Sequence, residues 1–242
     1  MLEIRHDSMN ESRNIQQAYD DIYATEGIMH NDSLYLWLIG LLHPGTGHTL
    51  IDISCGQGRL IELAQQQGLN AIGIDFSIFG VRKGYEDSPS SGWVVGDGEY
   101  LPMEDMCADY VTHIGSLEHY YRPEYGAREI KRILKPSGKA CILLPNAFGL
   151  LGNILHVCST GDIFDDGQPL QRYGTRRYWR NLLIEGGLQV EKTLGYGEVT
   201  FPRTTQDAVN WFKNPRKIVR FALTPIIPLN LTNHLVYICT RA

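Results

Sequence analysis

The sequence of 242 residues contains no long hydrophobic run, few cysteines and no excess of positive charge. Its longest apolar stretches, Leu34–Leu42 and Phe221–Leu229, fall far short of the ~20 residues that a membrane-spanning helix requires. With 22 basic and 27 acidic residues, the net charge of −5 provides no general attraction for nucleic acid. We therefore expect neither a transmembrane segment nor a polyanionic partner.

Cysteine usage argues against a disulfide framework and against a metal site. The five cysteines are odd in number and widely spaced, and several lie inside apolar runs, where they behave as small hydrophobic residues. No Cys-x-x-Cys or His-Glu-x-x-His motif occurs, so we expect no metal. The polar start of the chain, Met1–Gln17, is unlike a signal peptide. Reduced thiols then favour a cytoplasmic protein; the cysteines are Cys55, Cys107, Cys141, Cys158 and Cys239.

One stretch, residues 50–75, organises the rest of the chain. A short apolar run meets two glycines, Gly56 and Gly58, before a helical pattern and a second apolar run that ends on Asp75. Without a Cβ, the glycines allow a sharp turn and let a flat or charged ligand lie against the backbone. Asp52 and Asp75 are 75 − 52 = 23 residues apart, close to the ~20 expected between the turn and the ribose-binding acid of a βαβ unit. The stretch therefore predicts a nucleotide site.

Elsewhere, strands alternate with helices, which implies right-handed crossovers and a mostly parallel α/β sheet. A polar, mobile arm is expected over residues 1–13, and a turn over Lys135–Gly138, before the fifth strand. The segments 147–174 and 196–233 break the alternation and are expected as irregular insertions over the site. The predicted strands are 49–53, 71–74, 93–95, 109–114, 140–144, 188–194 and 234–240, and the predicted helices include 14–27, 31–42, 60–68 and 175–185.

Five motifs occur in a specific order. They are Ile51-Asp-Ile-Ser-Cys-Gly-Gln-Gly58, Gly73-Ile-Asp-Phe-Ser77, Gly96-Asp-Gly-Glu-Tyr-Leu-Pro102, Leu117-Glu-His119 and Arg132-Ile-Leu-Lys-Pro-Ser-Gly138. In this order and spacing, the chain resembles the class I S-adenosylmethionine-dependent methyltransferases, in the broad group that includes the ubiquinone and menaquinone methyltransferases. The likeness is strong over residues 49–145 and weaker over 175–194.

The resemblance implies a Rossmann-like, doubly wound sheet of about seven strands, with an antiparallel last strand and helices on both faces. It implies a single domain, 1–242, with a helical N-terminal cover (1–46), a cofactor-binding core (47–145) and a C-terminal part (146–242) that carries the two insertions. The activity implied is metal-independent methyl transfer from S-adenosylmethionine, leaving S-adenosylhomocysteine, to an O, N or C atom of a small molecule.

Carried over position by position, the resemblance also assigns the cofactor site. Gly56 and Gly58 would lie under the methionine part, with Asp52 near its ammonium group. The ribose hydroxyls would bind Asp75, and Phe76, Asp97 and the Gly98 backbone would contact the adenine, with Ile114 lining the cleft behind the sulfonium. Ser54 departs from the family pattern, which usually has glycine there; a Cβ restricts φ and narrows the gap for the methionine part.

Three further side chains are candidates for chemistry or closure. His119 follows the fourth strand and has an ordinary pKa near ~6.5, which suits a general base; alternatively, Leu-Glu-His only anchors the next helix. Because proximity and orientation can supply much of the acceleration of methyl transfer, a base is not obligatory. Tyr19 and Tyr23, one turn apart, would close over the cofactor or substrate, or be core contacts.

A cationic helix is expected between Pro215 and Pro225. Its basic residues would rest on an anionic membrane surface, grip an acidic, lipid-like acceptor, or form a solvated helix face; they are Lys213, Arg216, Lys217 and Arg220. Two other functions share the central motif. One is a non-catalytic S-adenosylmethionine-binding protein, which Ser54 keeps open. The other is a nicotinamide-dependent oxidoreductase, although the turn lacks a full Gly-x-Gly-x-x-Gly and no Tyr-x-x-x-Lys pair occurs.

Overall fold

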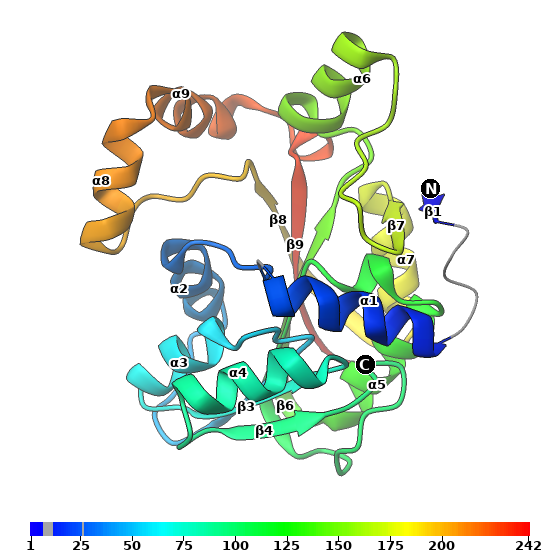
Figure 1. Cartoon of the computed structure of the whole chain (residues 1–242), viewed down its shortest axis with the longest axis vertical. Helices are drawn as coiled ribbons and strands as arrows, with labels where there is room; N and C mark the ends of the chain where they lie inside the picture. The colour runs from blue at the N-terminus through cyan, green and yellow to red at the C-terminus, as the bar shows by residue number, and fades with distance from the viewer. Residues whose placement is uncertain (7–11, 26) are drawn as a thin grey trace.

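The computed structural model describes residues 1–6, 12–25 and 27–242, and its centre is a seven-stranded sheet (Figure 1). The strands lie in the order β4-β3-β2-β5-β6-β9-β8. Only β9 runs antiparallel to its neighbours, β6 and β8. This confirms the α/β fold class predicted from the sequence. The bounds are β2 Thr49–Ile53, β3 Asn70–Asp75, β4 Gly92–Val95, β5 Ala108–Ile114, β6 Leu134–Pro145, β8 Leu188–Tyr196 and β9 His234–Arg241.

Helices cover both faces of this sheet. On one face, α2 (Asp32–Leu41) and α3 (Arg59–Gln66) bury side chains such as Leu38 and Ile61, and α4 (Ile78–Asp87) packs beside them along β3 and β4. On the other face, α5 (Pro123–Ile133) and α7 (Arg176–Glu185) bury Ile130 and Trp179. Parallel strands buried on both faces are mostly apolar, as β2 is at Leu50, Ile51 and Ile53; its Asp52 is the buried exception. The doubly wound arrangement places the carboxyl ends of β2, β3, β4 and β5 at one edge.

The turn after β2 adopts the left-handed backbone that its glycines suggested. Gly56 has φ +53° and Gly58 has φ +77°, and Ser54 also lies in this region at φ +58°. Gly58 is the N-terminal cap of α3, and a Cβ built on it would lie 1.9 Å from the ring of Trp93. Gly58 therefore serves both the turn and the contact with the indole.

The expectations of a mobile arm over residues 1–13 and of a wholly irregular segment over 147–174 are both wrong in part. Residues 2–5 of the supposed arm form strand β1 (Leu2–Arg5), which pairs antiparallel with β7 (Leu170–Tyr173) inside the segment expected to be irregular. The buried Arg172 guanidinium pairs with Glu3 at 2.7 Å, and its N–H groups donate to the Tyr120 and Tyr121 carbonyls. Burial of this cation requires such partners, which stabilise the small sheet. Residues 7–11, also part of the expected arm, lie outside the described residues.

The expected turn at Lys135–Gly138 lies within β6. Ala108 pairs with Leu134 and Tyr110 with Lys139, so the four residues between Leu134 and Lys139 bulge out of the ladder. The assigned strand therefore begins earlier than predicted.

The remaining elements lie above the edge of the sheet at which the carboxyl ends of the parallel strands are found. Helix α1 (Ser12–Thr25) crosses in front of the sheet, and α6, α8 and α9 stand at the top of the view in Figure 1. None of the helices in the described ranges has the length and apolar run required to cross a bilayer. The bounds are η1 Leu117–His119, η2 Leu150–Ile154, α6 Leu155–Thr160, α8 Thr205–Lys213, α9 Pro215–Leu223, η3 Thr224–Ile226 and η4 Leu229–Leu231.

The contact between Gly58 and Trp93 predicts a large loss of stability for Gly58→Ala. The new Cβ would carry both the left-handed backbone cost of about 1–2 kcal/mol and an overpacking cost of about 1–3 kcal/mol. Gly47→Ala is the matched control, because Gly47 has φ +81° but no atom within 4 Å of a built Cβ. In urea unfolding without ligand, we expect Gly58→Ala to lower the free energy of unfolding clearly more than Gly47→Ala does. Equal losses in the two variants would contradict the packing argument.

Candidate functional site

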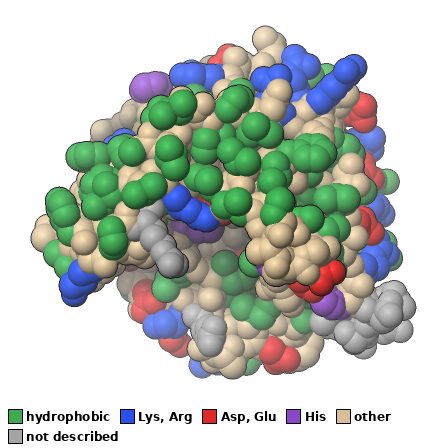
Figure 2. All heavy atoms as spheres, turned by 90° about the horizontal axis from the view of Figure 1, so that it is seen from above, with side chains coloured by type: hydrophobic (Ala, Val, Ile, Leu, Met, Phe, Trp, Pro, Cys, Tyr) green, Lys and Arg blue, Asp and Glu red, His purple; other side chains and the backbone are tan. Residues whose placement is uncertain are grey.

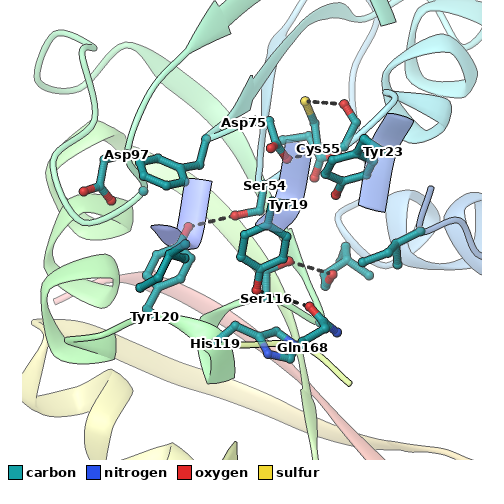
Figure 3. Close-up of a pocket in the computed structure, with 18 of the residues that line it drawn as sticks. Tyr19, Tyr23, Ser54, Cys55, Asp75, Asp97, Ser116, His119, Tyr120 and Gln168 are labelled. Atoms are coloured by element: carbon teal, nitrogen blue, oxygen red, sulfur yellow. Dashed lines mark hydrogen bonds between the residues drawn. The ribbon is translucent and has the colours of Figure 1, made fainter. Parts of the chain in front are cut away.

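A cavity of about 380 Å³ lies where β2, β3, β4 and β5 end (Figure 3). The sequence predicted nine cofactor-binding positions and one catalytic position, and nine of these ten residues line the cavity. They are Asp52, Ser54, Gly56, Asp75, Phe76, Asp97, Gly98, Ile114 and His119. Gly58 does not line it, and its role in the described structure is the turn and the Trp93 contact. The fold thus brings together side chains from four motifs.

Asp75 joins the two halves of the βαβ unit. Its Oδ2 accepts a hydrogen bond of 2.7 Å from the Gly56 backbone N–H, and its Oδ1 accepts one of 2.8 Å from the Ser77 N–H. The cap of α4 is Ser77, whose Oγ accepts from the Gly80 N–H. Asp75 therefore stabilises the turn. Because each carboxylate oxygen accepts more than one hydrogen bond, it retains acceptor capacity toward the cavity.

The floor of the cavity is acidic and largely dehydrated. Burial raises the pKa of Asp52 to about 7 despite a 2.7 Å hydrogen bond from the Thr112 hydroxyl, and nearby Asp75 raises it further. Burial also raises the pKa of Asp75 to about 6, and partial desolvation raises the pKa of the more exposed Asp97. Ionised carboxyls in such a place are stabilised by a cation. These carboxyl acceptors therefore fit a positively charged ligand that carries hydroxyl and amino groups. S-adenosylmethionine is such a ligand.

Ser54 is part of a hydrogen-bonded chain that the sequence did not reveal. Its Oγ lies 2.9 Å from the Tyr120 hydroxyl, which lies 3.0 Å from Nε2 of the buried His113. Burial lowers the pKa of His113 to about 3, so its ring is neutral. The Tyr120 side chain also packs against Gly98, where a Cβ would come within 1.7 Å of the phenol oxygen. The departure from glycine at Ser54 thus connects the turn to β5 and to the Asp97 loop.

Helix α1 supplies the cover of the cavity. Tyr19 and Tyr23 both line it, and their side chains lie across from Ser54 and Asp75 in Figure 3. The Tyr19 hydroxyl donates to Gln168 Oε1 at 3.2 Å, and a Cβ on Gly56 would come within 2.9 Å of the Tyr23 hydroxyl. Of the two interpretations of these tyrosines, closure over the site agrees with their position.

His119 is buried at the opposite wall, where its tautomer is fixed. Nδ1 lies 2.5 Å from the Leu170 carbonyl, which only accepts, so Nδ1 carries the proton. Nε2 lies 3.9 Å from both Glu118 Oε1 and Asp166 Oδ2. Burial lowers the pKa of His119, while Asp166 raises it. A neutral ring with a free Nε2 lone pair is the form that accepts a proton.

Several lining residues escaped prediction because distant segments bring them to the site. Tyr120 directly follows the motif Leu117–His119 and Glu99 lies within the motif Gly96–Pro102, so these motifs could have suggested them. Gln168 comes from the segment 147–174 and His30 precedes α2; neither carries a local signal. Within the described structure, no residue of the segment 196–233, which was expected as an insertion over the site, lines this cavity. It packs instead on the start of α2, where Asp207 accepts from the Ser33 N–H and hydroxyl.

Sequence comparison shows that the central part of the chain is similar to a known family. Residues 51–142 match a family described as "Methyltransferase domain". The demethylmenaquinone methyltransferase of Renibacterium salmoninarum is 29% identical over 40% of this chain and 40% of its own length. A 2-phytyl-1,4-naphtoquinone methyltransferase of Nostoc punctiforme is 33% identical over 40% of this chain and 46% of its own length. The aligned part thus spans less than half of these curated relatives.

Structural comparison extends the likeness to most of the chain. An S-adenosylmethionine-dependent methyltransferase from Mesorhizobium loti superposes with a TM-score of 0.64 over 87% of this chain and 99% of its own. At 14% identity, this agreement concerns the fold. The chain is thus similar to methyltransferases in sequence over residues 51–142, and it shares the fold of an S-adenosylmethionine-dependent methyltransferase over most of its length.

Proposed function

We propose that the protein transfers a methyl group from S-adenosylmethionine to an O, N or C atom of a small, hydrophobic acceptor, with a hydroxylated aromatic ring of the quinol type as the best-supported class. The observation that carries the proposal is the cavity, which gathers four carboxyl groups, the glycine turn and several aromatic rings at one sheet edge. Its relatives' names point to quinone-type rings. Phenol or ring-carbon methylation of such an acceptor releases one proton.

The residues that would hold the cofactor follow from the geometry. Asp75 would accept from the ribose hydroxyls, Asp97 from the adenine amino group and Asp52 from the ammonium end, while Phe76 packs on the adenine ring. When bound, S-adenosylmethionine supplies a methyl group activated by its sulfonium. Tyr19 and Tyr23 exclude water from this position, because α1 lies over it. Orientation in such an enclosed site supplies a large part of the rate enhancement.

His119 would take the proton that the acceptor loses. The His119 ring lines the cavity with Nε2 3.9 Å from both Glu118 Oε1 and Asp166 Oδ2, and the Leu170 carbonyl holds the ring in one orientation. The proton moves from an acceptor hydroxyl to Nε2 as the methyl group joins the acceptor. The resulting imidazolium would be stabilised by Asp166, whose charge already favours the protonated ring.

The primary test is calorimetry with S-adenosylmethionine and S-adenosylhomocysteine, followed by turnover on a panel of quinol, phenol, amine and carboxylate acceptors. We expect both ligands to bind, Asp75→Asn to weaken binding at least about tenfold, since it loses a charged acceptor, and Asp105→Asn, an exposed control, to bind normally. Absence of heat from both ligands would refute the proposal. Tight binding with no product on any acceptor would instead favour a non-catalytic binding protein.

The raised pKa values of Asp52 and Asp75 predict a pH-dependent cofactor effect. Both folded pKa values, about 7 and about 6, exceed the ordinary value near ~3.9. The two carboxyl groups therefore contribute to the free energy of unfolding while they are protonated in the folded protein. This contribution is present below pH ~4 and is lost as the pH rises through about 6 and 7. Because a cationic ligand favours the ionised groups, we expect its affinity to rise about tenfold between pH 5.5 and pH 8. The shift in melting temperature on adding S-adenosylmethionine should be larger at pH 8; a pH-independent shift would contradict this coupling.

Removal of the proposed base should slow turnover and leave cofactor binding intact. We expect His119→Asn, whose amide can still donate to the Leu170 carbonyl, to lower kcat by about 10²–10³-fold, with S-adenosylmethionine affinity within about twofold of the wild type. The control His43→Asn changes an exposed histidine outside the cavity. Steady-state kinetics across pH 5.5–9 check this: the wild-type rate should fall on the acid side, and that limb should disappear in His119→Asn. An unchanged kcat would remove His119 from the mechanism.

A further inference from the structure

Exposed apolar side chains are concentrated in two segments beside the cavity. Among the described residues, 11 of the 23 exposed large hydrophobic side chains lie in residues 148–164 and 201–226, which together are less than a fifth of the chain. Phe212 is 74% exposed, Ile226 76% and Val219 58%. Such clustering on one side is unusual for a surface that faces only water. The remaining members of this set, here called the apolar face, are Phe148, Leu155, Val157, Ile163, Phe164, Phe201, Val209 and Leu223.

The elements that carry these side chains share one end of the molecule. In Figure 1, α6, α8 and α9 all stand at the top, and Figure 2 looks down on that end. Hydrophobic side chains form a broad band across it, and the band borders a hollow in the surface. Both segments lie close to the cavity in the chain or through a contact. Gln168, which follows α6, lines the cavity, and Asp207 bonds to Ser33, which is near the lining residues His30 and Tyr35 in the sequence.

The C-terminal half of the apolar face is also positively charged. Residues 199–233 contain five basic residues and one acidic residue, a net charge of 5 − 1 = +4 in a chain whose total is −5. The single acid, Asp207, is directed inward by its hydrogen bonds to Ser33. Arg220 pairs with Glu198 and donates to the Leu151 carbonyl, which ties α9 to the segment before α6. Lys213 is exposed, and among the described residues it forms no ion pair.

We propose that the apolar face docks on the surface of an anionic lipid bilayer. Protruding Phe, Ile, Val and Leu side chains together with nearby lysine and arginine are the combination that binds the boundary between headgroups and acyl chains. The positive segment complements anionic headgroups, at about 1 kcal/mol for each basic residue near the surface. The short helices α6, α8 and α9 can lie on such a surface without crossing it. Charge favours this occupant over a second copy of this acidic chain, whose contact would be isologous and would bring two positive segments together.

This inference rests in part on the proposed function, because a hydrophobic acceptor would be drawn from the bilayer. Docking through α6 and α9 would present the adjoining cavity to the lipid, so that the acceptor ring could enter without crossing water. The lipid contact itself requires no cofactor and no turnover. Binding to vesicles and methyl transfer can therefore be tested separately.

The test is co-sedimentation of the full chain with vesicles of phosphatidylglycerol and phosphatidylethanolamine, compared with vesicles of phosphatidylcholine. We expect binding to the anionic vesicles, at least about tenfold weaker binding to the neutral ones, and weakening by 0.5 M salt, because screening removes the charge attraction. The variant Phe212→Ser/Ile226→Ser should bind the anionic vesicles at least about tenfold more weakly than the wild type, because it removes two exposed hydrophobic side chains from the apolar face. Lys213→Glu should bind less tightly and lose part of the salt dependence.

The matched control is Tyr85→Ser/Ile184→Ser, which removes two exposed hydrophobic side chains from α4 and α7, away from the apolar face. It should bind vesicles like the wild type, and all variants should bind S-adenosylmethionine with wild-type affinity. The proposal is overturned if the wild type does not sediment with anionic vesicles, or if the control and Phe212→Ser/Ile226→Ser lose binding equally. It is also overturned if sedimentation equilibrium shows a dimer that Phe212→Ser/Ile226→Ser dissociates, since the face would then cover a second copy.

Discussion

The hydrogen bond from the Gly56 N–H to Asp75 Oδ2 is the contact on which the site depends. It joins the turn after β2 to the end of β3, and both oxygens of this buried carboxyl already accept backbone N–H groups. With Asp52 close by and also buried, the edge of the sheet holds acidic groups whose pKa values are raised. Because burial disfavours the ionised forms of Asp52 and Asp75, a cationic ligand would stabilise them, and the sulfonium of S-adenosylmethionine has that charge.

The turn beside these acidic groups differs from an ordinary glycine turn in the hydrogen bonds that stabilise it. Ser54 keeps a left-handed backbone, which is costly for a residue with a Cβ, and its hydroxyl continues into Tyr120 and His113. The small β1–β7 sheet braces the opposite wall, since Arg172 reaches the carbonyls that follow η1 and Leu170 orients His119. Cofactor site and candidate base are thus held by separate elements, which allows the acceptor side to vary without disturbing the turn.

The segment 196–233 is likewise structurally separate from the cavity. The segment 196–233 supplies none of the described cavity lining, yet it is anchored to α2 and directs its apolar side chains outward. The proposed hydrophobic acceptor and an apolar, positively charged surface beside the cavity are physically consistent, because both reduce the exposure of such an acceptor to water.

From the sequence came the mostly parallel α/β sheet and, through the family resemblance, about seven strands with an antiparallel last one and ten site positions, nine of which line the cavity. Those features are local: apolar runs, glycines and carboxyls lie within a few residues of one another, and parallel strands bring their carboxyl ends to one edge. Only the tertiary structure decided the pairing of β1 with β7, the Ser54–Tyr120–His113 chain and the packing of Trp93 on Gly58. Each joins residues distant in sequence, and no local pattern encodes which buried donor meets which acceptor.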